Sequence, residues 1–133
     1  MKDLIQTAID NGNLNILIST VQEVGLEDVL RSDGPYTMFA PTDEAFSKLP
    51  KKTLKFLLQD KERLTEILTY HIIYGAKKSK EVIKNKQSTT IHGLRLVFDG
   101  SGSGTVNAAT FLHKDIECKN GVIHIIDQVL IPK

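Results

Sequence analysis

The hydrophobic pattern of this 133-residue chain changes its period near residue 70, and this change restricts the fold classes that the chain can adopt. In the first half, apolar residues recur with helical spacing, as Leu14, Leu17, Ile18 and Val21 do at positions i, i+3, i+4 and i+7. From Ile72 onward, short runs of β-branched and aromatic residues are separated by turn residues, which is typical of strands. Helices that precede strands, without alternating with them, predict an α+β fold.

Capping residues and prolines mark where the predicted elements begin and end. Asp3 and Thr42 are placed as helix N-caps, and a further helix is expected to start near Asp60. Pro41 is expected to end the strand before Thr42, because proline cannot donate to a sheet ladder. The predicted strands are Tyr36–Ala40, Ile72–Tyr74, Ser88–Ile91, Leu94–Phe98, Thr105–Val106, Phe111–Cys118 and Val122–Leu130. The glycine–serine run 100–104 is expected to be a flexible connection between two strands.

The dipeptide Asn120-Gly121 is the strongest hairpin signal in the chain, because a type I′ turn needs positive φ at both central positions. A two-residue turn at this point sets the register of the flanking strands. The expected cross-strand pairs are Cys118 with Ile123, Glu117 with His124, and Ile116 with Ile125. Asp127 would then share an apolar face with Ile123, Ile125 and Val129. A carboxylate buried there would need backbone N–H groups or a histidine as partners.

Composition excludes several classes of function. Seventeen basic and sixteen acidic residues give a formal charge of +1, which argues against a dedicated nucleic-acid surface. No apolar run approaches the roughly 20 residues needed to span a bilayer. Cys118 is the only cysteine, so no internal disulfide can form. Residues 1–6 contain no apolar segment of the kind found in signal peptides, so we expect either a cytoplasmic protein or a mature fragment that follows a new methionine.

The residues that could carry chemistry are few and scattered. The histidines are His71, His92, His113 and His124, and no two have close metal-ligand spacing, so we expect no metal and no cofactor. His71 continues the apolar stripe of the helix that starts near Asp60, so we interpret it as a core histidine satisfied by one or two hydrogen bonds rather than as a general base. The chain has neither a Gly-x-Ser-x-Gly elbow nor the Gly-Lys-Ser/Thr end of a phosphate loop, so no catalytic residue is predicted.

A local basic cluster is the one strong charge feature. It contains Lys77, Lys78, Lys80, Lys84 and Lys86. Such a cluster could contact sulfated glycan or anionic lipid, but Glu81 interrupts it and the net charge is near zero, so a solvated face is the favoured interpretation.

Three segments together resemble the signature of the fasciclin domain family. The first runs from Tyr36 to Phe46 (YTMFAPTDEAF), the second is the pair Tyr70-His71, and the third runs from Asn120 to Pro132 (NGVIHIIDQVLIP). The likeness spans almost the whole chain in the right order, although Tyr74 stands where the family usually has proline before Gly75. The residues of the two long motifs that we interpret as framework are Phe39, Pro41, Thr42, Asp43, Phe46, Asn120, Gly121, His124 and Asp127.

The resemblance implies a fold and a set of expectations about function. The fold would be a single domain over residues 1–133, in which a β-wedge or sandwich is packed with largely N-terminal helices. In members of the family, the histidine of the Tyr-His pair is bound to the first motif. In this chain the same contact would bring His71 within hydrogen-bonding reach of Thr42 or Asp43. In some animal members the Tyr-His region takes part in partner binding, which would map to Tyr70, His71 and their neighbours. The family also implies an extracellular, periplasmic or cell-surface location.

Two hypotheses about function follow, and a third is disfavoured. The first is a non-enzymatic adhesion module whose partner is a cell-surface or matrix protein or a glycan, with no nucleic acid and with membrane attachment only through an anchor outside this chain. The alternative is a carrier of an apolar ligand, a lipid or carotenoid, in a helix–sheet cleft. An enzyme that uses His71 or His124 with Asp127 is the third.

Overall fold

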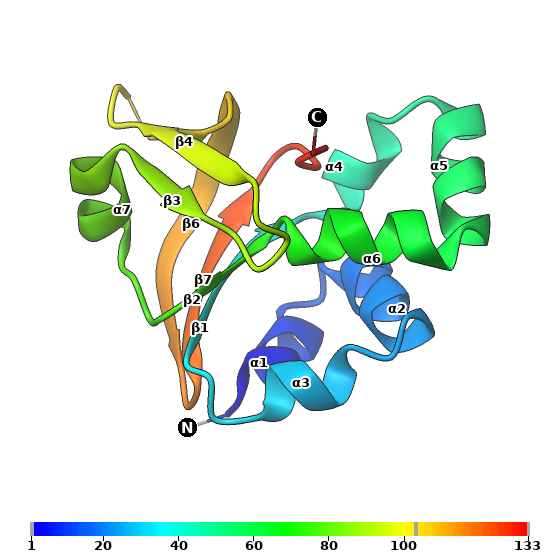
Figure 1. Cartoon of the computed structure of the whole chain (residues 1–133), viewed down its shortest axis with the longest axis horizontal. Helices are drawn as coiled ribbons and strands as arrows, with labels where there is room; N and C mark the ends of the chain where they lie inside the picture. The colour runs from blue at the N-terminus through cyan, green and yellow to red at the C-terminus, as the bar shows by residue number, and fades with distance from the viewer. Residues whose placement is uncertain (1, 103, 133) are drawn as a thin grey trace.

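The computed structural model describes residues 2–102 and 104–132 (Figure 1). The helices are α1 (Leu4–Asn11), α2 (Asn15–Glu23), α3 (Glu27–Arg31), α4 (Asp43–Ser47), α5 (Lys51–Gln59), α6 (Lys61–Thr69) and α7 (Ser79–Asn85). The strands are β1 (Tyr36–Pro41), β2 (Ile72–Tyr74), β3 (Gln87–Thr89), β4 (Arg95–Asp99), β5 (Thr105–Val106), β6 (Ala109–Cys118) and β7 (Gly121–Ile126). Six of the seven helices precede the second strand, so the predicted α+β order is confirmed. Both ends of the predicted domain and Ser103 of the predicted connection lie outside the described residues.

The strands form one sheet in the order β2-β1-β7-β6-β5-β4-β3. The second and third strands in this order, β1 and β7, run parallel to each other, while all other neighbours are antiparallel. Every residue of β1 and of β7 is buried, as expected for parallel strands covered on both faces. The two long sequence motifs therefore lie side by side at the centre of the protein, although they are nearly ninety residues apart in the chain.

Helices cover one face of this sheet. Met38 and Ala40 of β1 and Ile123 and Ile125 of β7 pack against the buried faces of α1, α2 and α6. The predicted N-caps are confirmed: the Asp3 carboxylate accepts the Gln6 N–H at 2.8 Å, and the Thr42 hydroxyl accepts the Ala45 N–H at 3.0 Å. β1 continues through Pro41 rather than ending before it.

The other face is covered by the sheet itself. Phe39 of β1 lies with its ring centroid 5.5 Å from that of Phe98 in β4, although three strands separate β1 from β4 in the sheet order. The sheet must therefore fold over, which encloses a second apolar cluster around Phe39, Ile73, Leu96 and Phe111. In Figure 1, β3 and β4 accordingly pass across β6 and β7. This folded sheet with helices on its outer face matches the expected wedge.

The predicted register of the last hairpin is wrong by two residues. Cys118 pairs with Gly121 rather than with Ile123, and Glu117 pairs with Val122 rather than with His124. The turn therefore consists of Lys119 and Asn120, neither of which is among the described non-glycine residues with positive φ. Asn120-Gly121 therefore predicts a hairpin at the right place, but the type I′ turn with positive φ, on which that prediction rests, does not form.

The same shift changes the surroundings of two acidic residues. Glu117 pairs across the hairpin with Val122 rather than with His124, and its carboxylate forms an ion pair with Lys78 at 2.7 Å on the surface. β7 ends at Ile126, so Asp127 lies beyond the strand rather than on its apolar face. Its carboxylate accepts the Thr110 N–H at 2.8 Å, which confirms that this residue takes a backbone N–H as partner.

The sequence predicts no helix where α7 lies. The helix has only Val82 and Ile83 as apolar contacts with the second cluster, which is too short a stripe to show in the sequence. Its start is held by Asp115 of β6, whose carboxylate accepts both the Ser79 N–H at 2.7 Å and the Ser79 hydroxyl at 2.8 Å. This cap comes from a residue 36 positions away and could not be read locally.

Candidate functional site

His71 is buried at the end of α6, with 1% of its surface exposed. Its Nδ1–H donates to the Ile67 carbonyl at 2.7 Å, and its Nε2 accepts the Leu130 N–H at 2.9 Å. The two bonds together require the neutral Nδ1–H tautomer. They confirm the interpretation of a satisfied core histidine.

The expected contact between the His71 ring and Thr42 or Asp43 is wrong, because both ring nitrogens are already bonded to other residues. His71 is nevertheless tied to the first motif through its backbone, since its carbonyl accepts the Phe39 N–H at 2.9 Å. The ring instead holds the C-terminal segment at Leu130 against the end of α6. Burial lowers the pKa of His71 from 6.5 to about 4.

Lowering the pH from 6.5 to about 4 is expected to reduce the free energy of unfolding by about 3 kcal/mol through His71 alone. Across this interval the unfolded chain protonates the ring while the folded protein keeps it neutral, so the unfolded state binds more protons and gains stability. Above pH 6.5 the ring is neutral in both states and contributes no pH dependence. Urea unfolding at a series of pH values measures the effect.

Two variants separate this contribution from that of other groups. His71→Gln removes the buried titration, so its stability should depend less on pH over the same interval. His113→Ala removes an exposed histidine and should keep the slope of the parent protein. Equal slopes in the parent and His71→Gln proteins would contradict the assignment.

Tyr70 is also buried, with 5% of its surface exposed, but its hydroxyl reaches the floor of a groove. The hydroxyl donates to the Arg95 carbonyl at 2.8 Å and accepts from the Asn107 side-chain amide at 2.8 Å. Asn107 in turn bonds to the backbone of Val97 through both its N–H and its side-chain oxygen. Tyr70 thereby links the end of α6 to β4.

The groove beside Tyr70 has a volume of about 570 Å³. One wall is the outer face of β4, where Arg95 and Val97 point outward between buried residues. The other wall is the segment from Gln128 to Ile131, which the bond from Leu130 to His71 holds in place. Val97 is 58% exposed and Ile131 is 39% exposed, so the groove presents apolar surface to solvent around one cationic side chain. We call this feature the Tyr70 groove.

The structure brings together only part of the predicted site. Tyr70 and His71 adjoin the groove but lie mainly in the interior, and partner binding by their side chains stays a prediction. The site predicted from the sequence does not include Arg95, Val97, Asn107 or Ile131, which line the groove or support it. The alternation of residues 94–98 indicates that Arg95 and Val97 face outward. No local signal indicates that the C-terminal segment lies opposite them.

His124 is held in the same way as His71. Its Nδ1 accepts the Asp115 N–H at 3.1 Å, its Nε2–H donates to the Lys77 carbonyl at 2.9 Å, and its ring stacks on Phe39 with centroids 5.5 Å apart. Burial lowers the pKa of His124 below its ordinary value. Asp127 lies elsewhere and bonds to Thr110, so the residues of the disfavoured enzyme hypothesis are not assembled into one site.

The framework residues of the two motifs connect elements to one another. Phe39 and Phe46 fill the core. Asp43 belongs to α4 but caps the start of α2, because its carboxylate accepts the Ile16 N–H at 2.8 Å. Asn120 is buried and bonds to α1 and α3, and Gly121 lies against the backbone of Tyr36.

Two further features of the structure bear on the kind of site. Among residues 2–102 and 104–132, no three His, Cys, Asp or Glu side chains are grouped so that they could hold a metal ion. Over the same residues, no helix has the length and apolar character to cross a membrane.

Comparisons with known proteins agree on one family. The sequence profile of the fasciclin domain matches residues 12–132. The chain is 36% identical to an uncharacterized protein of Synechocystis, with 98% of each chain covered. It is 38% identical to transforming growth factor-beta-induced protein ig-h3 of Sus scrofa, over 87% of this chain but only 17% of that protein. Among solved structures, a FAS1 domain pair from the insect cell adhesion molecule fasciclin I superposes with a TM-score of 0.69 and 26% identity, covering 91% of this chain and 46% of that one.

Proposed function

Because the chain belongs to the fasciclin domain family, we propose that it is a non-enzymatic adhesion or interaction module that acts in the extracellular space, in the periplasm or at the cell surface. Members of this family are generally non-enzymatic adhesion proteins. The partner is a cell-surface or matrix protein or a glycan. The module consists of residues 1–133 acting as one domain.

The observation that carries this proposal is the Tyr70 groove. Its rim offers the exposed apolar side chains of Val97 and Ile131 and the guanidinium of Arg95, and apolar and arginine side chains commonly anchor protein interfaces. Tyr70 and His71 act behind this surface: they hold its two walls together through the bonds to Asn107 and Leu130. A partner therefore contacts the residues next to the Tyr-His pair, together with the Tyr70 hydroxyl edge.

The state of the buried histidines supports a non-enzymatic role. Both ring nitrogens of His71 and of His124 are engaged with the backbone, and burial lowers both pKa values. A general base has to reach the proton that it removes, and neither ring has a free nitrogen with which to do so.

A carrier of a small apolar ligand is the second candidate, and the size of the same groove favours it. Its volume of about 570 Å³ falls within the range typical of small-molecule sites, and Val97, Val129 and Ile131 supply apolar contacts. Native mass spectrometry of protein from its own host distinguishes the two candidates, because a carrier retains a lipid or pigment in a one-to-one complex.

Replacing Val97 by lysine is expected to weaken partner binding at least about tenfold, because it places a charge on the apolar rim beside Arg95. The measurement is the binding of the fluorescently labelled chain to intact cells and to purified matrix proteins and glycans. Val29→Lys is the matched control, because Val29 is 45% exposed on α3 and does not line the Tyr70 groove. If both variants are folded and bind equally well, the Tyr70 groove is not the surface that contacts the partner.

A further inference from the structure

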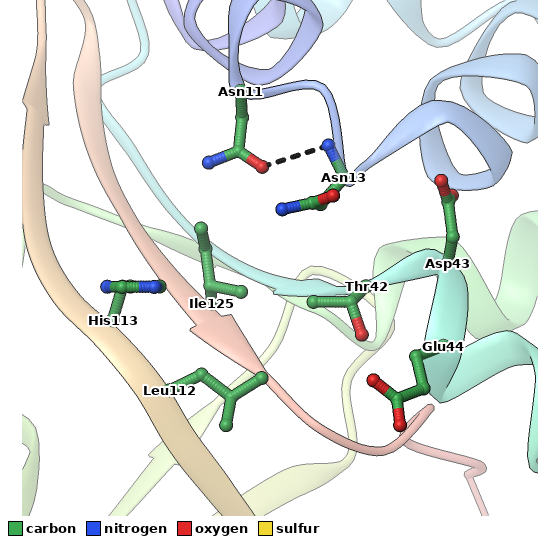
Figure 2. Close-up of a pocket in the computed structure, with 8 residues that line it drawn as sticks. All are labelled: Asn11, Asn13, Thr42, Asp43, Glu44, Leu112, His113 and Ile125. Atoms are coloured by element: carbon green, nitrogen blue, oxygen red, sulfur yellow. Dashed lines mark hydrogen bonds between the residues drawn. The ribbon is translucent and has the colours of Figure 1, made fainter.

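A second cavity, of about 250 Å³, lies beside the first motif and apart from the Tyr70 groove. Figure 2 shows Asn11, the last residue of α1, and Asn13, from the connection between α1 and α2, on one side of it. Glu44 of α4 and Leu112 and His113 of β6 lie around the other side. Ile125 of β7 also lines it, so four separate segments supply side chains to one hollow. We call it the Asn13 cavity.

Most polar groups of this cavity are free to bind a ligand. The Asn13 side-chain amide, the Glu44 carboxylate and the His113 ring make no hydrogen bond to any residue in 2–102 or 104–132. The Asn11 side-chain oxygen accepts the Asn13 N–H at 3.2 Å, which leaves its NH₂ group as a donor. By contrast, the Asp43 carboxylate at the edge of the cavity is already occupied by Ile16 and Asn15.

This set of groups fits vicinal hydroxyls better than it fits an ion. Amides and imidazole both donate and accept hydrogen bonds, and the Glu44 carboxylate accepts from O–H groups. Leu112, which is 49% exposed, offers an apolar surface beside them for the C–H face of a ring. The cavity has carboxylates but no lysine or arginine among its lining residues, so it disfavours sulfated or acidic sugars.

We propose that the Asn13 cavity binds one neutral sugar residue of a glycan. This inference rests on the proposed function, because it names a partner class for the interaction module, and it adds a site separate from the Tyr70 groove. Glu44 and Asn13 bond to adjacent hydroxyls, His113 and Asn11 to the remaining polar groups, and the ring face packs on Leu112. A single sugar with so few contacts binds with a Kd of about 1 mM.

The test is a titration of the labelled protein, followed by amide and histidine-ring NMR, with free neutral sugars. The probes are glucose, galactose, mannose, N-acetylglucosamine and N-acetylgalactosamine, with glucuronic acid and the 6-O-sulfate ester of N-acetylglucosamine as acidic counterparts. The expected result is a saturable shift of the Asn13 side-chain amide and of the His113 ring with at least one neutral sugar, and weaker binding of the acidic ones. If no neutral sugar produces this shift, or if an acidic sugar binds more tightly, the inference is overturned.

Matched variants assign the binding to the cavity. Glu44→Ala and Asn13→Ala should each raise the Kd at least about tenfold. Glu81→Ala and Asn85→Ala remove the same two residue types from α7 and should leave the Kd unchanged. Unchanged affinity in the two cavity variants, with native amide spectra, overturns the site.

The two proposals fail in distinguishable ways. A protein that binds cells through the Tyr70 groove but binds no neutral sugar contradicts only the sugar site. A protein that binds a neutral sugar in the Asn13 cavity, but whose binding to cells and matrix is absent, contradicts only the proposed function. Val97→Lys should leave the Kd for the sugar unchanged, because Val97 does not line the Asn13 cavity.

Discussion

A Gly121→Ala protein is expected to lose at least about 4 kcal/mol of stability, a large fraction of the stability of a domain of this size. A Cβ on residue 121 would lie 1.9 Å from the Tyr36 carbonyl oxygen, a separation that real Cβ atoms essentially never show. Relief requires that β1 move away from β7, which would break the bond from the Tyr36 N–H to the Asn120 carbonyl and open a core buried on both faces. Urea unfolding followed by circular dichroism measures the loss.

Gly12→Ala is the control that separates steric overlap from the general cost of replacing glycine. Gly12 has a φ of +84°, but an added Cβ there meets nothing within 4 Å. The expected cost is only about 1–2 kcal/mol, from the left-handed backbone alone. If Gly121→Ala were no more destabilising than Gly12→Ala, the close approach of Tyr36 to Gly121 would not be a constraint on the fold.

Gly121 also shows where sequence reasoning stops being sufficient. A glycine after asparagine between two apolar runs predicts a turn, and a turn does occur at this point. Residue 121 has to be glycine because it packs against the parallel neighbour β1. That strand is nearly ninety residues away in the chain, so a local sequence pattern does not indicate the contact. The register differs for the same reason, because the residue pattern places Gly121 in the turn, whereas its packing against β1 makes it the first residue of β7.

Patterns that depend on a residue's own neighbours were predicted correctly. Asp3 and Thr42 cap helices within three residues of themselves, and the spacing of Leu14, Leu17 and Ile18 marks a buried helix face. The burial of His71 follows from its position after an apolar stripe.

The candidate sites depend on long-range geometry and could not be predicted in this way. The Tyr70 groove exists because the fold of the sheet brings β4 opposite the C-terminal segment. The Asn13 cavity likewise gathers residues from four segments. Neither arrangement leaves a periodic signal in the sequence.

Asn120→Ala is expected to cost roughly 3–5 kcal/mol, although residue 120 lies in a two-residue turn. The Asn120 side-chain oxygen accepts the Leu4 N–H at 2.9 Å, and its NH₂ group donates to the Leu30 and Ser32 carbonyls at 2.8 and 2.6 Å. These are groups at the start of α1 and at the end of α3 that have no partner within their own helices. Alanine would leave the Leu4 N–H and the Leu30 carbonyl unpaired in the interior, and the Ser32 carbonyl without this partner at its edge.

Two variants test whether the loss comes from this double cap. Lys119→Ala changes the exposed neighbour in the same turn and should alter the free energy of unfolding by less than about 0.5 kcal/mol. Asn120→Asp keeps the acceptor for Leu4 but points a carboxylate at the Leu30 and Ser32 carbonyls, so it should be nearly as destabilised as Asn120→Ala. Stability close to that of the parent protein in Asn120→Asp would mean that the two donated bonds contribute little. The attachment of α1 and α3 to the hairpin would then have to come from apolar packing.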